Sequence, residues 1–338
     1  MRCAMRTLGR TGTAVLLATL LPGQHDGSAP PPARLGVFFW HDSPNDEATW
    51  NGLRQGLAEA RLAATFVERR AGGDRPRALA QLDELRAADC ALVVALGTEA
   101  ALLAKERLPD VPVVFAAVSN AVASGVVADW SGSGSNLCGA SNWIDPAAVL
   151  ETFQLAVPRL HKLGMLRSRA SGVVSAAELT TMRERLQQPD APKVTLVEAV
   201  AADADDLGRA VQELLAAGVD AIWIPVDLTV YQHTERVIEA LGARPVPLLS
   251  TAATAVRKGA LAGATVDYAL HGRRAAGLVL DVLVRKKTPG SLPIDRMRGS
   301  CVLVNVPAAR RLGRELPLSL LLLADELIDA EAGRAPGR

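Results

Sequence analysis

The stretch ALVVALGTEAALLAKERLPDVPVVFAAVSNAVASGVV, residues Ala91–Val127, decides the fold class of this chain. It holds a valine-rich apolar run (Ala91–Leu96), a helix-like segment (Glu99–Arg107) and a second apolar run (Val111–Val118). Short apolar runs separated by a helical segment are typical of a β-α-β unit in a parallel sheet that is buried on both faces. We therefore predict two neighbouring parallel strands joined by a crossover helix.

A polar turn follows each of the two predicted strands: Gly97-Thr98 after the first and Ser119-Asn120 after the second. Open α/β sheets bind ligands in the crevice at the carboxyl ends of their strands, where both turns would lie. A turn that opens a helix offers free backbone N–H groups, and the helix dipole favours an anion such as an α-carboxylate. We predict that these four residues line a ligand site, with a plain helix N-cap as the alternative for Thr98.

The same alternation of apolar runs and helical segments continues on both sides of this stretch, and Gly52 and Gly56 in the first helix would allow close packing on a sheet. In the N-terminal half we expect strands at Arg34–Trp40, Ala63–Glu68 and Asn136–Ser141, and helices at Asp46–Ala60 and Pro76–Ala87. Further on we expect strands at Lys162–Leu166, Val194–Ala199, Ala221–Pro225 and Val246–Ser250, and helices at Pro146–Val157, Ala176–Gln187, Ala204–Ala217 and Thr229–Leu241. Two such runs predict an α/β protein with two doubly wound parallel-sheet lobes.

The C-terminal part is too short to build a third lobe. It holds a strand within Gly259–Asp267, a helix at Leu270–Arg285, a strand at Cys301–Val306 and a helix at Pro307–Arg314. These elements have to complete sheets already built, so the chain would cross between the lobes three times and leave a hinged cleft. The expected first lobe is 30–142 with about 268–300, and the second is 143–267 with about 301–330.

Composition excludes several classes of function. The 338 residues are 49% hydrophobic and 22% charged, with a formal net charge of +1 and no basic stripe, which argues against nucleic acid as a partner. The motifs GxGxxG, GxxxxGK[ST], GxSxG, HExxH and CxxC are absent, so we expect no enzyme, no cofactor and no metal site. Cys90, Cys138 and Cys301 are widely spaced within apolar runs, which indicates free thiols rather than a disulfide framework.

The N-terminal segment Met1–Ala29 has the order of regions of a secretory signal peptide. An arginine-containing start (MRCAMRTLGR) precedes a short apolar run (TGTAVLLATLLPG) and a polar, small-residue segment. We expect cleavage after Ala29 and a periplasmic or secreted mature protein, with a disordered extension of a cytoplasmic protein as the alternative. No later stretch is long and apolar enough to predict a transmembrane helix.

Eight segments then carry a family resemblance through their order and spacing. They are GLRQGLAEA (Gly52–Ala60), VVALGTEAA (Val93–Ala101), PVVFAAVSNAVASGVV (Pro112–Val127), DAIWIPVD (Asp220–Asp227), GALAGATVDY (Gly259–Tyr268), GRRAAGLVLDVL (Gly272–Leu283), VLVNVPAARRLGRELP (Val302–Pro317) and ADELID (Ala324–Asp329). Together they resemble the ABC-transporter substrate-binding proteins of the tryptophan/tyrosine-binding type, which have the type I periplasmic-binding-protein fold. The resemblance implies a monomer that captures an amino acid or similar small molecule and delivers it to an ABC permease. Asn120-Ala121 departs from the family's usual Asp-Pro, which changes the charge of the cleft.

The resemblance also implies further ligand contacts. Asp227 stands where the family has an acidic residue facing the cleft and would pair with a ligand ammonium group, or else cap a helix. Tyr268 matches a family Asp-Tyr pair and would stack on a ligand or pack in the hinge. Trp40 and Asp42 end the first predicted strand and so face the same crevice, where Trp40 is either a wall or part of the core. Trp143 is a second candidate wall.

Two other classes of function remain open from the sequence. A ligand-sensing module that docks on a membrane receptor or histidine kinase would have the same lobes and the same cleft. An enzyme on a doubly wound sheet is the other alternative, against which the missing nucleophile and phosphate motifs count.

Overall fold

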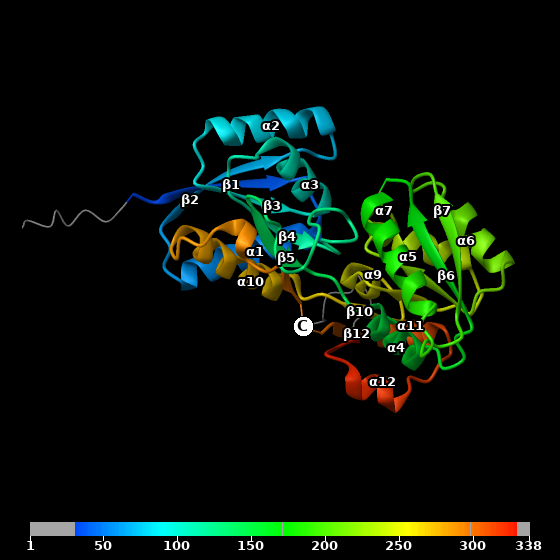
Figure 1. The fold of residues 1–338 in the computed structure, drawn as a ribbon. Coiled ribbons are helices and arrows are strands. Elements are labelled where there is room, and N and C mark those ends of the chain that lie inside the picture. Colours follow the sequence, from blue (N-terminus) through cyan, green and yellow to red (C-terminus); the bar gives the residue numbers. More distant parts are fainter. Residues whose placement is uncertain (1–30, 171, 298, 330–338) are drawn as a thin grey trace, which may run out of the picture. The chain divides into compact units, whose positions relative to one another are not determined.

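The computed structural model describes residues 31–329 except for residues 171 and 298. The predicted signal peptide, Met1–Ala29, lies outside the described residues. Two separate sheets carry the fold, each with helices on both faces (Figure 1). We call the six-stranded sheet and its helices the first lobe, and the seven-stranded sheet and its helices the second lobe.

The sheet of the first lobe is parallel and has the strand order β11-β5-β4-β3-β1-β2. Its strands are β1 (Ala33–Phe39), β2 (Ala64–Arg70), β3 (Leu92–Leu96), β4 (Val113–Val118), β5 (Leu137–Ser141) and the short β11 (Asp295–Arg296). Helices α1 (Pro44–Glu59) and α10 (Tyr268–Leu283) cover one face. Helices α2 (Arg75–Ala87) and α3 (Thr98–Arg107) cover the other. The β-α-β unit predicted from Ala91–Val127 is therefore confirmed as β3-α3-β4.

The sheet of the second lobe has the order β13-β12-β10-β9-β8-β6-β7 and is parallel except where β10 meets β12. Its strands are β6 (Lys162–Ser168), β7 (Thr195–Ala201), β8 (Ala221–Ile224), β9 (Leu248–Ser250), β10 (Ala262–Thr265), β12 (Cys301–Asn305) and β13 (Glu326–Ile328). Helices α4 (Pro146–Ala156), α5 (Gly172–Leu186), α11 (Val306–Arg311) and α12 (Leu318–Leu323) pack on one face. The other face carries α6 (Leu207–Ala216), α7 (Leu228–Gln232), α8 (Thr234–Leu241) and α9 (Ala253–Arg257).

The chain crosses between the two sheets three times, as predicted. It leaves the first sheet after β5, returns to it with α10 and β11, and leaves again for β12. A short 3-10 helix, Pro289–Ser291, lies on the returning segment. The fold is thus two doubly wound α/β lobes with three connections, the architecture of type I periplasmic binding proteins.

Several elements differ from the sequence-based expectation. The helix expected over Thr229–Leu241 breaks into α7 and α8 because His233 has non-helical backbone angles (φ −113°, ψ 34°). The strands β11 and β13 have two and three residues, and the helices α9 and α12 have five and six. Elements this short hold too few residues to show a hydrophobic period. The three cysteines Cys90, Cys138 and Cys301 are free, as expected.

Glycines let α1 and α10 pack unusually close to each other. A Cβ added at Gly52 would lie 2.0 Å from the Ala269 carbonyl oxygen, and one at Gly272 would lie 1.9 Å from the Thr49 carbonyl oxygen. A Cβ at Gly56 would likewise come within 2.8 Å of Cβ of Ala276. The expectation that Gly52 and Gly56 pack on the sheet is therefore wrong: both face helix α10, whose backbone leaves no room for a side chain.

We expect Gly272→Ala to lower the free energy of unfolding by about 2–3 kcal/mol, because the added methyl group must separate two helices in backbone contact. The matched control lies on the same helix: a Cβ at Gly277 would meet nothing within 4 Å. Gly277→Ala should raise stability by about 0.5–1 kcal/mol through helix propensity. Urea denaturation of both variants measures the difference, and equal effects at the two positions would contradict the packing argument.

Candidate ligand-binding cleft

Two neighbouring pockets lie where the carboxyl ends of the strands meet, and residues of both lobes line them. The two pockets share Ser119, Asn142 and Val226. Ser119 directly follows β4 and Asn142 directly follows β5, whereas Val226 follows β8 of the second lobe after one intervening residue. The site therefore forms at the place that the parallel-sheet argument predicts.

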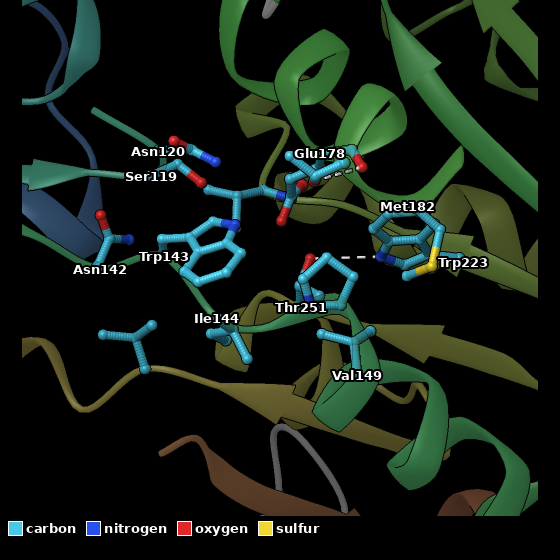
Figure 2. Close-up of a pocket in the computed structure, with 14 residues that line it drawn as sticks. Ser119, Asn120, Asn142, Trp143, Ile144, Val149, Glu178, Met182, Trp223 and Thr251 are labelled. Carbon is cyan, nitrogen blue, oxygen red and sulfur yellow. Dashed lines mark hydrogen bonds between the residues drawn. The ribbon is translucent and has the colours of Figure 1, made fainter. Parts of the chain in front are cut away.

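The first pocket, which we call the apolar pocket, spans about 440 Å³ including open solvent, of which about 20 Å³ is free for a water-sized molecule. Its walls are mostly large apolar side chains of the second lobe, together with a few polar groups. The apolar lining residues are Trp143, Ile144, Pro146, Val149, Met182, Trp223, Val226 and Val266. Figure 2 shows Ser119, Asn120 and Asn142 gathered at one side of this pocket, with Trp223 and Met182 at the other. Such a pocket suits an aromatic or branched aliphatic group.

The second pocket, which we call the acidic pocket, has an empty volume of about 610 Å³. It is lined mainly by polar side chains of the first lobe and closed from the second lobe by Val226, Leu228 and Tyr231. The polar and aromatic lining residues of the first lobe are Trp40, His41, Ser43, Asn45, Asp46, Thr98, Glu99, Ser119, Asn142 and Tyr268. The Tyr231 hydroxyl is hydrogen-bonded to Ser43, so this pocket includes a direct polar contact between the lobes.

Two carboxyl groups lie at the start of helix α3. Asp46 in the first turn of α1 is only 8% exposed, and both of its carboxyl oxygens lie 3.7 Å from the position that a Cβ on Gly97 would take. Burial is the main cause that raises the pKa of Asp46 to about 7; the negative charges of Glu99 and Glu47 add to the rise, and Ser43 and Arg70 oppose it. Burial also raises the pKa of Glu99, and its own backbone N–H opposes the rise. Neither of these acids has a basic partner among the described residues that line the pocket.

A third carboxyl group, that of Glu178 on α5, enters the apolar pocket from the second lobe. It accepts hydrogen bonds from the backbone N–H of Val226 (2.8 Å) and from the Thr251 hydroxyl, which in turn accepts one from Nε1 of Trp223 (3.3 Å). These contacts hold the carboxyl group in place (Figure 2). Removal from water raises the pKa of Glu178 to about 7, so its charge varies across the physiological pH range.

Three buried polar atoms of the lining have no hydrogen-bond partner within the described protein. They are Oγ1 of Thr98, Oδ1 of Asn142 and Nε1 of Trp143. Thr98 is 1% exposed and Asn142 is 4% exposed. Because unpaired buried polar atoms are rare and costly, a concentration of them in one pocket indicates groups that a ligand satisfies.

A bulge at the end of β4 shapes the shared lip of the two pockets. The register of β4 against β5 shifts between Phe115 and Val118, and Ala117 has a positive φ of 56°. The Ala117 N–H donates to Nε2 of His271 on α10 (3.1 Å). Burial lowers the pKa of His271 to about 4, so its ring is neutral and free to accept this bond. The bulge thus aims Ser119 and the turn after it at the cleft.

The structure brings six of the eight predicted site residues to the pockets. Gly97, Thr98, Trp40 and Tyr268 line the acidic pocket, Asn120 lines the apolar pocket, and Ser119 lines both. Thr98 is not the helix cap, because Gly97 occupies that position and Thr98 is the first residue of α3. The Tyr268 hydroxyl accepts a hydrogen bond from Nδ2 of Asn142 (3.2 Å). Trp143, the second candidate wall, lines the apolar pocket.

The other two predicted residues, Asp227 and Asp42, line neither pocket. The carboxylate of Asp227 is fully buried. It caps α7 by accepting a hydrogen bond from the N–H of Val230. It also accepts hydrogen bonds from the N–H (2.7 Å) and the hydroxyl (2.9 Å) of Ser168. Its oxygens accept three hydrogen bonds within the second lobe, and the pairing with a ligand ammonium group stays a prediction. Asp42 is exposed and pairs with Arg70 (2.8 Å).

Four residues that line the pockets were not predicted from the sequence: Asp46, Glu99, Glu178 and Asn142. The three acids lie within helices, where an acidic residue near the N-terminus is an ordinary way to complement the dipole. Asn142 follows a strand just as Ser119 does, so the rule of strand ends could have identified it. Glu99 directly follows the predicted Gly97-Thr98 turn, so the same rule could have indicated it. For Asp46 and Glu178 no sequence signal was available, because contacts between distant helices bring them to the cleft.

Comparison with known proteins supports the class that the fold and the cleft define, a two-lobed ligand-binding protein. Residues 35–328 match the family described as ABC transporter substrate binding protein. The chain belongs to this family.

Similar proteins agree with that assignment. A tyrosine-binding protein of Clostridioides difficile (strain R20291) is 23% identical over 214 residues, which span 63% of this chain and 60% of that relative. The structure of an ABC domain in complex with L-Trp from Streptococcus pneumonia superposes with a TM-score of 0.77 at 23% identity, over 88% of this chain and 100% of that one. A conserved domain protein from Vibrio cholerae has a TM-score of 0.78 at 26% identity, over 87% and 99% of the two chains.

The described residues hold neither a metal-binding cluster nor a membrane-spanning helix. Residues 31–329, with the gaps at 171 and 298, contain no group of three or more His, Cys, Asp and Glu side chains arranged to hold a metal ion. Within the same part of the chain, no helix combines the length and the apolar character needed to cross a membrane.

Proposed function

We propose that this protein is an extracytoplasmic solute-binding protein, which captures a small amine-bearing molecule such as an amino acid between its lobes and delivers it to an ABC permease. It acts as a monomer after removal of Met1–Ala29. The observation that carries the proposal is the pair of adjoining pockets, whose lining combines an aromatic wall, three carboxyl groups and unpaired buried polar atoms. Membership of the substrate-binding family supports the transport role.

Closure of the lobes on the ligand gives this arrangement its mechanism. Thr98, Ser119 and Asn142 belong to the first lobe, whereas Glu178 and Trp223 belong to the second. A ligand that fills both pockets makes its full set of contacts only when the lobes are together. Binding therefore stabilises the closed state, which is the form that a permease would recognise.

We expect purified protein, unfolded and refolded to remove carried-over ligand, to melt about 5 °C higher when a cognate amine is present at a hundredfold its dissociation constant. Such a ligand adds about 2.7 kcal/mol of stability. Thr98→Val should weaken binding about tenfold, because it removes a buried hydroxyl that has no partner within the protein. The exposed Thr65→Val is the matched control and should bind normally. A thermal-shift screen that finds no hit among amino acids, amines and amides would reject the proposal.

A further inference from the structure

The charges of the cleft narrow the class of ligand, and this inference rests on the proposed function. We propose that the ligand is a primary amine with an aromatic or bulky aliphatic group and without a free carboxylate, so that it is a cation rather than a zwitterion. Amides of amino acids and decarboxylated amines belong to this class.

The first observation is the one-sided charge of the lining. Asp46, Glu99 and Glu178 contribute three carboxyl groups, and no Lys or Arg is among the described residues that line either pocket. The remaining titratable side chain of the lining that could be positive, His41, has a pKa lowered by burial, which favours its neutral form. A ligand with a free carboxylate would therefore enter a site that has negative groups and no positive partner.

Two arginines near the cleft, Arg70 and Arg296, are engaged elsewhere, whereas the exposed Arg169 directly precedes the lining residue Ala170 but lines neither pocket itself. Arg70, whose charge acts on Asp46, donates to Asp42 (2.8 Å) and Glu68 (3.2 Å) and also pairs with Glu47. Arg296 stacks over the rings of Trp130 and Trp143, at 4.9 Å and 5.5 Å from their centres. Neither guanidinium group lines the apolar or the acidic pocket.

The second observation concerns the start of helix α3, where the N–H groups would otherwise suit an anion. The half-buried carboxyl group of Glu99, the second residue of α3, lines the pocket there. The Asp46 carboxyl group lies beside Gly97, the residue that caps the helix. The protein thus places two of its own acids at the helix start, where we predict that the carboxylate of an amino-acid ligand would bind, and an ionised acid there repels a carboxylate.

The third observation is that two of the three unpaired buried atoms of the lining can accept from an ammonium group, whereas the third, Nε1 of Trp143, is a donor. Oγ1 of Thr98 and Oδ1 of Asn142 are buried and unpaired, and both residues line the acidic pocket. A primary ammonium group has three N–H donors and no acceptor, so it can satisfy such oxygens together with a carboxylate. The aromatic wall of Trp143 and Trp223 in the adjoining pocket takes the apolar part of the molecule.

The test is isothermal titration calorimetry at pH 7, where the α-amino group of an amide, with an ordinary pKa of about 7.7–8.0, is mostly protonated. The matched sets of compounds differ only at the carboxyl position. One set is tryptophan, tryptophanamide and tryptamine; parallel sets are built on phenylalanine and leucine, and indole-3-propionate serves as the amine-free acid. In at least one set we expect the amide and the decarboxylated amine to bind ten times or more tighter than the parent amino acid. The amine-free acid should not bind.

Each outcome decides between the two proposals. An amino acid that binds as tightly as its amide overturns the cationic-ligand inference and leaves the binding function standing, whereas no binding by any compound overturns both. The affinity ratio is the dissociation constant of the amino acid divided by that of its amide. Glu99→Gln and Glu178→Gln, one in each lobe, should each lower this affinity ratio, the gap between the two ligands, at least threefold. Glu106→Gln, on the exposed side of α3, is the matched control and should keep the gap. A gap unchanged in both cleft variants counts against the inference.

Discussion

Asp227→Ala should lower the free energy of unfolding of the ligand-free protein by about 4 kcal/mol. The carboxylate of Asp227 is fully buried and accepts from three donors: the N–H of Val230 and both the N–H and the hydroxyl of Ser168. The variant leaves the two Ser168 donors buried and unpaired, at about 1–3 kcal/mol each, whereas the Val230 N–H keeps its bond to the Asp227 carbonyl oxygen (3.1 Å). The bonds to Ser168 also join the end of β6 to the start of α7, so their loss loosens the second lobe. Urea denaturation without ligand measures the change.

The control for this prediction is Asp145→Ala, which removes an exposed cap. Asp145 caps α4 by accepting from the N–H of Ala147, and its loss should cost about 1 kcal/mol. If Asp227→Ala costs no more than that, its carboxylate is only a cap. If Asp227→Ala leaves stability unchanged but abolishes ligand binding, Asp227 pairs with the ammonium group of the ligand, as the family resemblance implies.

The fold was predictable because both sheets are built from short apolar runs separated by helical segments. The runs Ala91–Leu96 and Val111–Val118 became β3 and β4, and the return of the C-terminal part to both sheets followed from its length alone. The break at His233 was not predictable, because the apolar period of the segment continues across it and only the backbone there departs from the helix. Periodicity reports which face is buried and not where a helix bends.

The candidate site was predictable only in part, for the same physical reason. Residues that follow strands, such as Thr98 and Ser119, could be placed because every parallel strand brings its carboxyl end to one edge of the sheet. Asp227 also follows a strand, yet a cap and a ligand contact need the same residue type at the same place. The acids Asp46 and Glu178 depend on contacts between distant helices, which no local pattern encodes.

The turn at Asn120 shows how the cleft can lose one charge and keep its shape. Oδ1 of Asn120 accepts a hydrogen bond from the N–H of Ala123 (2.9 Å), a bond that an aspartate could make equally well. The turn therefore folds without the carboxylate that the family usually has there. The negative charge of the site comes instead from Asp46, Glu99 and Glu178, which places it at the start of α3 and on the second lobe.

Those buried acids should make the ligand-free protein less stable as the pH rises, and Asp46→Asn should remove a large part of the effect. The pKa of Asp46 is about 7 in the folded protein, raised mainly by burial and further by Glu99 and Glu47, while Arg70 and Ser43 act against the rise. Its ordinary value is 3.8, so the folded state holds the extra proton between about pH 4 and pH 7. Stability from this group is therefore fully present below about pH 4 and is lost as the pH rises through 7.

The expected size is up to about 4 kcal/mol, since each unit of pKa difference corresponds to about 1.4 kcal/mol. In urea denaturation from pH 4.5 to 8, the free energy of unfolding of Asp46→Asn should rise relative to that of the wild-type protein as the pH increases. The exposed Asp74→Asn should show no such trend. An ammonium ligand must reverse the slope for the wild-type protein, because its positive charge stabilises the ionised carboxylate that burial penalises. If the difference in unfolding free energy between Asp46→Asn and wild type stays constant with pH, Asp46 does not titrate in this range. The expected reversal of the slope by an amine would then have no cause.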